Sequence, residues 1–134
     1  MILYVGHQSE RMDQIIYILT NYADGYALKR FMHLEKLIHY LHQPPQKRTT
    51  HTVALLAPRS VYEMKVMHRI ANLWADIRLF VLLPDQNAEM IRQAHRLHPR
   101  CLLFQDEPLG YLKSVLQRLG SLGRMNSTRE SPIS

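Results

Sequence analysis

Cysteine and long apolar runs are both scarce in this chain. Cys101 is the single cysteine among 134 residues, which excludes an intrachain disulfide framework and favours a reducing compartment. The longest apolar runs are far shorter than the ~20 residues that cross a bilayer. No basic segment precedes the apolar residues 1–5, and polar residues follow them at once, unlike a secretory signal. These absences predict a cytoplasmic protein with no membrane partner.

Motifs for several kinds of catalysis are missing as well. Residues 6–9 lack the glycine spacing of a nucleotide-binding loop, and the chain has no Gly-x-Ser-x-Gly elbow. Eight histidines are present. His39 with His42, and His95 with His98, are spaced for one helix face, but structural zinc sites usually need four ligands. We therefore predict no enzymatic activity, no metal site and no cofactor.

Basic charge is in excess, but it is not gathered in one place. The formal net charge is +6, which makes an anionic partner worth considering. Nucleic-acid-binding proteins usually concentrate basic residues on one element. Here they fall in four segments, at Lys29–Arg30, Lys47–Arg48, Arg92–Arg100 and Arg118–Arg129. A solvated basic surface is the favoured interpretation, and a nucleic-acid-binding basic α/β domain remains an alternative.

Short apolar runs alternate with stripes of helical period along the chain. Strands are expected at residues 2–5, 26–31, 53–56, 79–83 and 101–104. Helices are expected after the capping residue Ser9, at 34–41, at 61–74, after the capping residue Asn87 and after Pro108. This alternation predicts an α/β fold, a single doubly wound five-stranded parallel sheet of order 2-1-3-4-5 with five helices. The domain is expected to cover residues 1–122, followed by a flexible tail or linker at 123–134.

The sequence also predicts some details within these elements. Residues 61–74 are expected to form one helix, with Ala71 and Trp74 on its buried face. A turn is expected at Asp24–Gly25. In the last helix, four leucines are expected to face inward: Leu109, Leu112, Leu116 and Leu119.

In element order, strand spacing and local punctuation, nearly the whole chain resembles the receiver domains of response regulators. In that family the first strand ends in an acidic pair that holds magnesium, and the matching residues are Gly6 and His7. The third strand ends in the phosphoacceptor aspartate, for which this chain has Ala57. The fourth ends in a switching Thr or Ser, matched by Leu83. The fifth ends in a Lys-Pro pair, which reads Glu107 and proline here.

The resemblance therefore implies a pseudo-receiver, which keeps the receiver fold without its phosphorylation. Magnesium needs carboxylate oxygens and an aspartyl phosphate needs a carboxylate nucleophile. Gly6, His7 and Ala57 supply neither, and Glu107 would repel a phosphoryl group. The strand order puts any site at the carboxyl ends of the first and third strands, where His7 and Arg59 are candidate contacts for a small ligand. A flavin-binding or ligand-binding flavodoxin-like protein is a further alternative.

The interaction surface is expected on the fourth helix, fifth strand and fifth helix, which in receivers contribute to a dimer face. Charges of both signs surround a tyrosine there, as a self-complementary contact requires: Arg92, Arg96, Asp106, Tyr111, Lys113 and Arg118. The expected function is a non-phosphorylated regulatory domain of bacterial signal transduction, acting on a protein partner or as a homodimer. One setting is the N-terminal part of a transcription regulator, whose separate downstream domain would bind nucleic acid.

Overall fold

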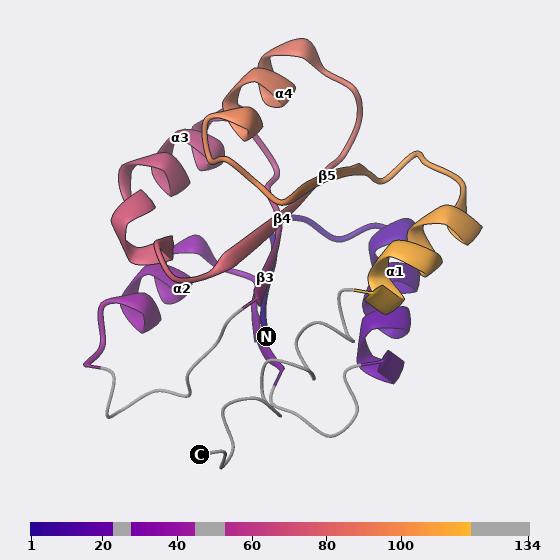
Figure 1. The fold of residues 1–134 in the computed structure, drawn as a ribbon, viewed down its shortest axis with the longest axis horizontal. Coiled ribbons are helices and arrows are strands. Elements are labelled where there is room, and N and C mark those ends of the chain that lie inside the picture. Colours follow the sequence, from indigo (N-terminus) through magenta and orange to yellow (C-terminus); the bar gives the residue numbers. More distant parts are fainter. Residues whose placement is uncertain (23–27, 45–52, 119–134) are drawn as a thin grey trace.

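The computed structural model describes residues 1–22, 28–44 and 53–118 (Figure 1). Five parallel strands form one sheet in the order β2-β1-β3-β4-β5. The strands are β1 (Ile2–Val5), β2 (Lys29–Phe31), β3 (Val53–Ala57), β4 (Arg78–Leu83) and β5 (Cys101–Phe104). The helices are α1 (Glu10–Tyr22), α2 (Leu34–Leu41), α3 (Val61–Arg69) with the short η2 (Ala71–Trp74), α4 (Ala88–His95) and a last helix over residues 109–118. The turn predicted at Asp24–Gly25, Leu119 and the tail 123–134 lie outside the described residues.

Helices cover both faces of the sheet. Figure 1 shows α1 and the last helix on one side, and α2, α3 and α4 on the other. Met12 of α1 and Leu112 of the last helix belong to one buried cluster, whereas Leu37 of α2, Met64 of α3 and Met90 of α4 belong to a second cluster. The arrangement confirms the predicted doubly wound parallel sheet and its strand order.

The central strands β1 and β3 are buried on both faces, which explains why their sequences are continuously apolar. Because side chains alternate along a strand, Val5 and Ala57 join the cluster beneath α1 and the last helix. Tyr4 and Leu56 join the cluster beneath α2, α3 and α4. The methyl group of Ala57 is therefore fully buried on the α1 side of the sheet.

Side chains cap three helices at their N-termini, where backbone N–H groups lack partners within the helix. The Ser9 hydroxyl accepts a hydrogen bond from the backbone N–H of Met12 at 3.1 Å. The Asn87 side chain accepts one from the N–H of Met90 at 3.0 Å. Both caps confirm the sequence prediction. Ser60 does the same for the N–H of Glu63, at 3.3 Å, ahead of α3.

The predicted helix over residues 61–74 is wrong in one respect, because it breaks at Ile70. The backbone of Ile70 lies outside the helical region (φ −104°, ψ 27°). A tighter turn follows, in which the N–H of Leu73 bonds to the Ile70 carbonyl at 2.9 Å. The break changes the helical phase, so Trp74 stays buried while Ala71 is exposed.

The last helix buries a narrower face than its leucines predict. Leu112 and Leu116 are fully buried, as expected, but Leu109 is 38% exposed. Leu109 lies in the first turn, closest to the carboxyl edge of the sheet, where less of the core is within its reach. Within the described ranges, no helix combines the length and apolar character needed to cross a membrane.

Candidate functional site

The carboxyl ends of β1 and β3 are tied together by the backbone. The N–H of Gly6 donates to the carbonyl of Ala57 at 2.8 Å, so the connection after β1 runs alongside the connection after β3. His7 follows on the first connection and Arg59 on the second. These are the strand ends at which the sequence predicts a site.

Gly6 is crowded on three sides. A Cβ atom at this position would lie 2.6 Å from Glu63 Oε1, 2.8 Å from the Arg59 nitrogen and 3.0 Å from the Ala57 oxygen. Two of these neighbours are backbone atoms, which cannot swing away as a side chain can. Glycine is therefore required here for close approach, and an acidic residue would not fit without rearrangement of the β3–α3 connection.

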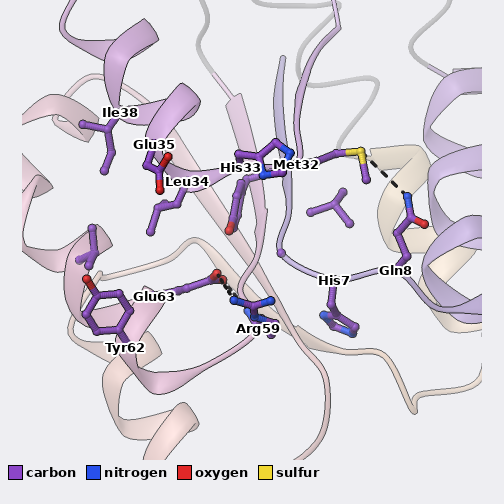
Figure 2. A pocket seen from close by; sticks show the side chains of 14 residues that line it. His7, Gln8, Met32, His33, Leu34, Glu35, Ile38, Arg59, Tyr62 and Glu63 are labelled. Atoms are coloured by element: carbon purple, nitrogen blue, oxygen red, sulfur yellow. Dashed lines mark hydrogen bonds and ion pairs between the residues drawn. The ribbon is translucent and has the colours of Figure 1, made fainter.

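Glu63 supplies a buried carboxylate that the sequence prediction missed. Its residue is only 7% exposed, although it comes from the first turn of α3. Its Oε1 accepts a hydrogen bond from the backbone N–H of Arg59 at 2.8 Å, and the Tyr4 hydroxyl also hydrogen-bonds to the carboxylate. Its Oε2 lies 3.9 Å from the Arg59 guanidinium (Figure 2). The sequence does contain a signal for this carboxylate, because Ser60 and Glu63 have the spacing of a capping box.

Tyr4 is the innermost member of this network. It lies in β1 and is almost fully buried. Burial, and then the nearby charge of Glu63, raise the pKa of its hydroxyl well above its ordinary value. The hydroxyl therefore stays protonated and able to donate to Glu63 at every physiological pH.

One cavity brings some of the predicted site residues together. Its volume is about 500 Å³, and Gly6, His7 and Arg59 line it together with residues of α2 and α3. Ala57 and Leu83 do not line it, because both are fully buried in the core. Glu107 does not line it either. The cavity is thus displaced towards β2 and α2 from Ala57, the residue that matches the phosphoacceptor of receiver domains.

Glu107 lies half-buried at the other end of this edge of the sheet. Burial, and then the charge of Asp106, raise the pKa of its carboxyl. Its Oε2 is buried and has no partner among the described residues. Burial, and then the Glu107 charge, also raise the pKa of the Cys101 thiol, which disfavours the reactive thiolate.

The donor set at the strand ends does not fit a magnesium ion, the metal that the receiver fold implies. A hard divalent cation needs several oxygen ligands. Glu63 provides the one carboxylate beside Gly6, and its oxygens are already engaged by Arg59 and Tyr4. Across residues 1–22, 28–44 and 53–118, no group of three or more His, Cys, Asp or Glu side chains could hold a metal.

The predicted interaction face combines an edge strand with exposed side chains. β5 is an edge strand, and three of its four residues are only partly buried. All six side chains predicted to act there are exposed, and one of them, Arg92, forms an ion pair with Glu89 within α4. The six are Arg92, Arg96, Asp106, Tyr111, Lys113 and Arg118.

No protein-family model matches the chain, and no curated protein matches it in sequence. Several solved structures do match it in fold. The phosphorylated cyanobacterial phytochrome response regulator RcpA gives a TM-score of 0.65 at 15% identity, covering 92% of each chain. A response regulator receiver domain from Rhodospirillum rubrum gives 0.65 at 10% identity, covering 92% of this chain and 93% of its own.

A third solved structure comes from a Burkholderia pseudomallei protein with a suggested link to pilus assembly. It gives a TM-score of 0.62 at 13% identity, covering 90% of this chain and 88% of its own. At such identities the likeness shows the fold alone. The chain has the fold of response-regulator receiver domains, as the resemblance in sequence pattern implies.

Proposed function

We propose that this chain is a regulatory domain of bacterial signal transduction that uses the receiver fold without accepting a phosphoryl group. It acts by contact with protein, in the first instance with a second copy of itself. Such a domain would work in the cytoplasm. The N-terminal part of a transcription regulator is one setting that would suit it, with nucleic acid bound by a separate downstream domain.

The arrangement around Gly6 carries the first half of this proposal. Phosphorylation of an aspartate needs a carboxylate nucleophile and a cation beside it. Ala57 stands at the end of β3 with its methyl group buried on the α1 side. The space beside Gly6 is filled by the carboxylate of Glu63, which is held by Tyr4 and by the backbone of Arg59. Glu63 is thereby occupied as a structural acceptor.

Treatment with a small phosphodonor tests this half directly. The chain is incubated with acetyl phosphate and Mg²⁺, or with beryllofluoride, beside a receiver domain that keeps its aspartate. We expect no added phosphoryl mass and no beryllofluoride-dependent amide shifts, whereas the control responds. Stoichiometric labelling of any single residue would contradict the proposal.

The exposed face on α4, β5 and the last helix supports the second half. It combines an edge strand, an exposed tyrosine and charges of both signs. A two-fold contact brings the same patch together with itself, so mixed charge permits complementary pairs. Tyr111 supplies the large amphipathic ring that contact centres favour.

Sedimentation of the chain tests for self-association through this face. We expect a concentration-dependent dimer, weakened at least about tenfold by Tyr111→Ala, which is ~1.4 kcal/mol. Tyr17→Ala is the matched control, because Tyr17 is as exposed but lies on α1. A monomer at high micromolar concentration, or equal weakening by both variants, would refute dimerisation through this face.

A further inference from the structure

The cavity between α2 and α3 has features that neither phosphorylation nor dimerisation explains. Its volume of about 500 Å³ lies within the ~300–1,000 Å³ typical of small-molecule sites. It opens on the β2 side of the carboxyl edge, away from the α4–β5 face. Figure 2 shows that its lining side chains come from the connections after β1, β2 and β3 and from both helices.

One end of the cavity carries two side chains, Arg59 and His7, that make no hydrogen bond to the described residues, although the Arg59 guanidinium lies within ion-pair distance of Glu63. The Arg59 side chain is 67% exposed, and its 3.9 Å approach to Glu63 is too long for a hydrogen bond. Nδ1 of His7 is buried and has no partner among the described residues. Figure 2 shows His7 and Arg59 on the same side of the cavity. A guanidinium beside an unpartnered imidazole is suited to a carboxylate or phosphate group.

The other end of the cavity is apolar. Leu34 and Ile38 line it from α2, and Val66 and Tyr62 line it from α3. The Tyr62 ring is 68% exposed, although it stands beside this cavity. An exposed aromatic ring next to an apolar wall can pack against a flat or aliphatic ligand body.

The two carboxylates that line the cavity do not favour a cation strongly. Glu63 is already hydrogen-bonded to the Arg59 backbone and to Tyr4, so its charge is largely compensated. Glu35 lies on α2 and is exposed to solvent, where water screens its charge. Arg59 and His7 lie at the same end of the cavity without a hydrogen-bond partner among the described residues, so this end favours an acid.

We propose that this cavity binds a small amphipathic acid. Its carboxylate or phosphate group is held by Arg59 and His7, and its aromatic or aliphatic body packs between Leu34, Ile38, Val66 and Tyr62. The inference does not depend on the lack of phosphorylation or on dimerisation, since the cavity and the α4–β5 face share no residue.

Titration of the full chain followed by amide NMR tests this site with four probes. Phenyl phosphate and benzoate carry both an acid and a ring, inorganic phosphate carries only the acid, and benzylamine carries the ring with a positive charge. We expect saturable shifts at Gly6, His7 and Leu34 with at least one of the first two probes, with a dissociation constant on the order of 1 mM. Inorganic phosphate and benzylamine should bind at least about tenfold more weakly.

Two substitutions test separately how the polar end and the apolar end of the cavity contribute to binding. Arg59→Ala and Tyr62→Ala should each weaken binding of the responding acid at least about fivefold. Arg69→Ala and Tyr17→Ala are matched controls, because these exposed residues do not line the cavity, and they should leave the affinity unchanged. Both test residues are exposed, so the unfolding midpoint should change little and confirms that the variants fold.

Several results would overturn the inference. One is the absence of saturable shifts with both aromatic acids at concentrations up to about 20 mM, which is roughly twenty times the expected dissociation constant. Another is benzylamine or inorganic phosphate binding as tightly as the aromatic acids, since the acid or the apolar wall would then contribute nothing. A third is full affinity in Arg59→Ala or in Tyr62→Ala.

Discussion

The strand ends around Gly6 and the surface around β5 use polar side chains in opposite ways. At Gly6, Tyr4 and Glu63 are buried and satisfy each other and the backbone of Arg59. Around β5, Tyr111 and its charged neighbours are exposed, and Arg92 pairs with its own helix neighbour Glu89. Buried polar groups are costly unless every partner is present, so the first region tolerates little change. The second can change with little effect on folding.

The largest expected effect comes from filling the space at Gly6. Gly6→Ala should destabilise the fold by about 3 kcal/mol, because the new Cβ would lie within 3.0 Å of backbone atoms of both Arg59 and Ala57. Gly6→Asp should be at least as harmful, since it adds a second carboxylate beside Glu63. Urea unfolding followed by the fluorescence of Trp74, the single tryptophan, measures both.

Gly110 provides the control for Gly6→Ala. A Cβ at Gly110 meets no atom within 4 Å, and the residue lies in the last helix. Gly110→Ala should therefore stabilise the fold by about 0.5–1 kcal/mol. If the two substitutions had similar effects, the crowding at Gly6 would not be the reason for its glycine.

Removal of the buried carboxylate should have the next largest effect. Glu63→Ala leaves the Arg59 N–H and the Tyr4 hydroxyl without their acceptor, which should cost about 2 kcal/mol of unfolding free energy. Glu10→Ala, an exposed glutamate in the first turn of α1, should change it by less than about 0.5 kcal/mol. The double variant with Tyr4→Phe should show a coupling energy of 0.5 kcal/mol or more, as contacting residues typically do. Strict additivity would argue against the Tyr4–Glu63 bond.

Stability should also fall in alkali because of Tyr4. In the unfolded chain a tyrosine ionises near pH ~10, whereas burial raises the pKa of Tyr4 in the folded state above that value. The folded state then binds more protons than the unfolded state, so stability is lost as pH rises above about 10. Urea unfolding at pH 8 and 10.5 should show a smaller loss in Tyr4→Phe than in the unsubstituted chain.

At Glu107 we expect a smaller effect, in which the substitution stabilises the fold. Its carboxyl has a raised pKa, caused first by burial and then by Asp106, so the ionised form is disfavoured in the folded state. The associated stability is present at acid pH and is lost as pH rises through the folded-state pKa. Glu107→Gln should therefore stabilise the fold at pH 7, by less than about 1 kcal/mol after solvent screening. The gain should vanish below pH 4, and a gain independent of pH would point to another cause.

The smallest effect on folding is expected at the interaction face. Tyr111→Ala and Lys113→Ala should each change the unfolding free energy by less than about 0.5 kcal/mol, because both side chains are exposed. Thermal unfolding measured at low concentration, where a dimer would dissociate, checks this. A loss above 1 kcal/mol in the monomer would mean that the face contributes to the fold.

Much of the fold follows from local pattern. The apolar runs at β1, β3, β4 and β5 predict buried parallel strands, and the caps at Ser9 and Asn87 mark their helices correctly. These features depend on near neighbours in sequence. The break at Ile70 and the exposure of Leu109 were not predicted, because helical period alone does not say where packing against the sheet ends.

The candidate site was predictable only in part. His7 and Arg59 follow strands whose ends were expected to meet, and both line the cavity. Ala57 and Leu83 were expected at the same place, but their side chains are buried in the core. Tyr62 and Glu63 were missed because they lie in the first turn of α3, where a capping glutamate and a surface tyrosine look ordinary.

The amino-acid sequence alone determined the α/β class and the absence of an aspartate at residue 57, because these depend on hydrophobic period and residue identity. It favoured the strand order through the rule that crossovers are right-handed, and the structure has that order. It could not determine that Glu63 fills the space beside Gly6, or that the cavity faces α2 rather than the buried end of β3. Both follow from the distances at which β1, β3 and α3 pack. Those distances are set by contacts between residues far apart in the chain, such as Tyr4 with Glu63 and Gly6 with Ala57.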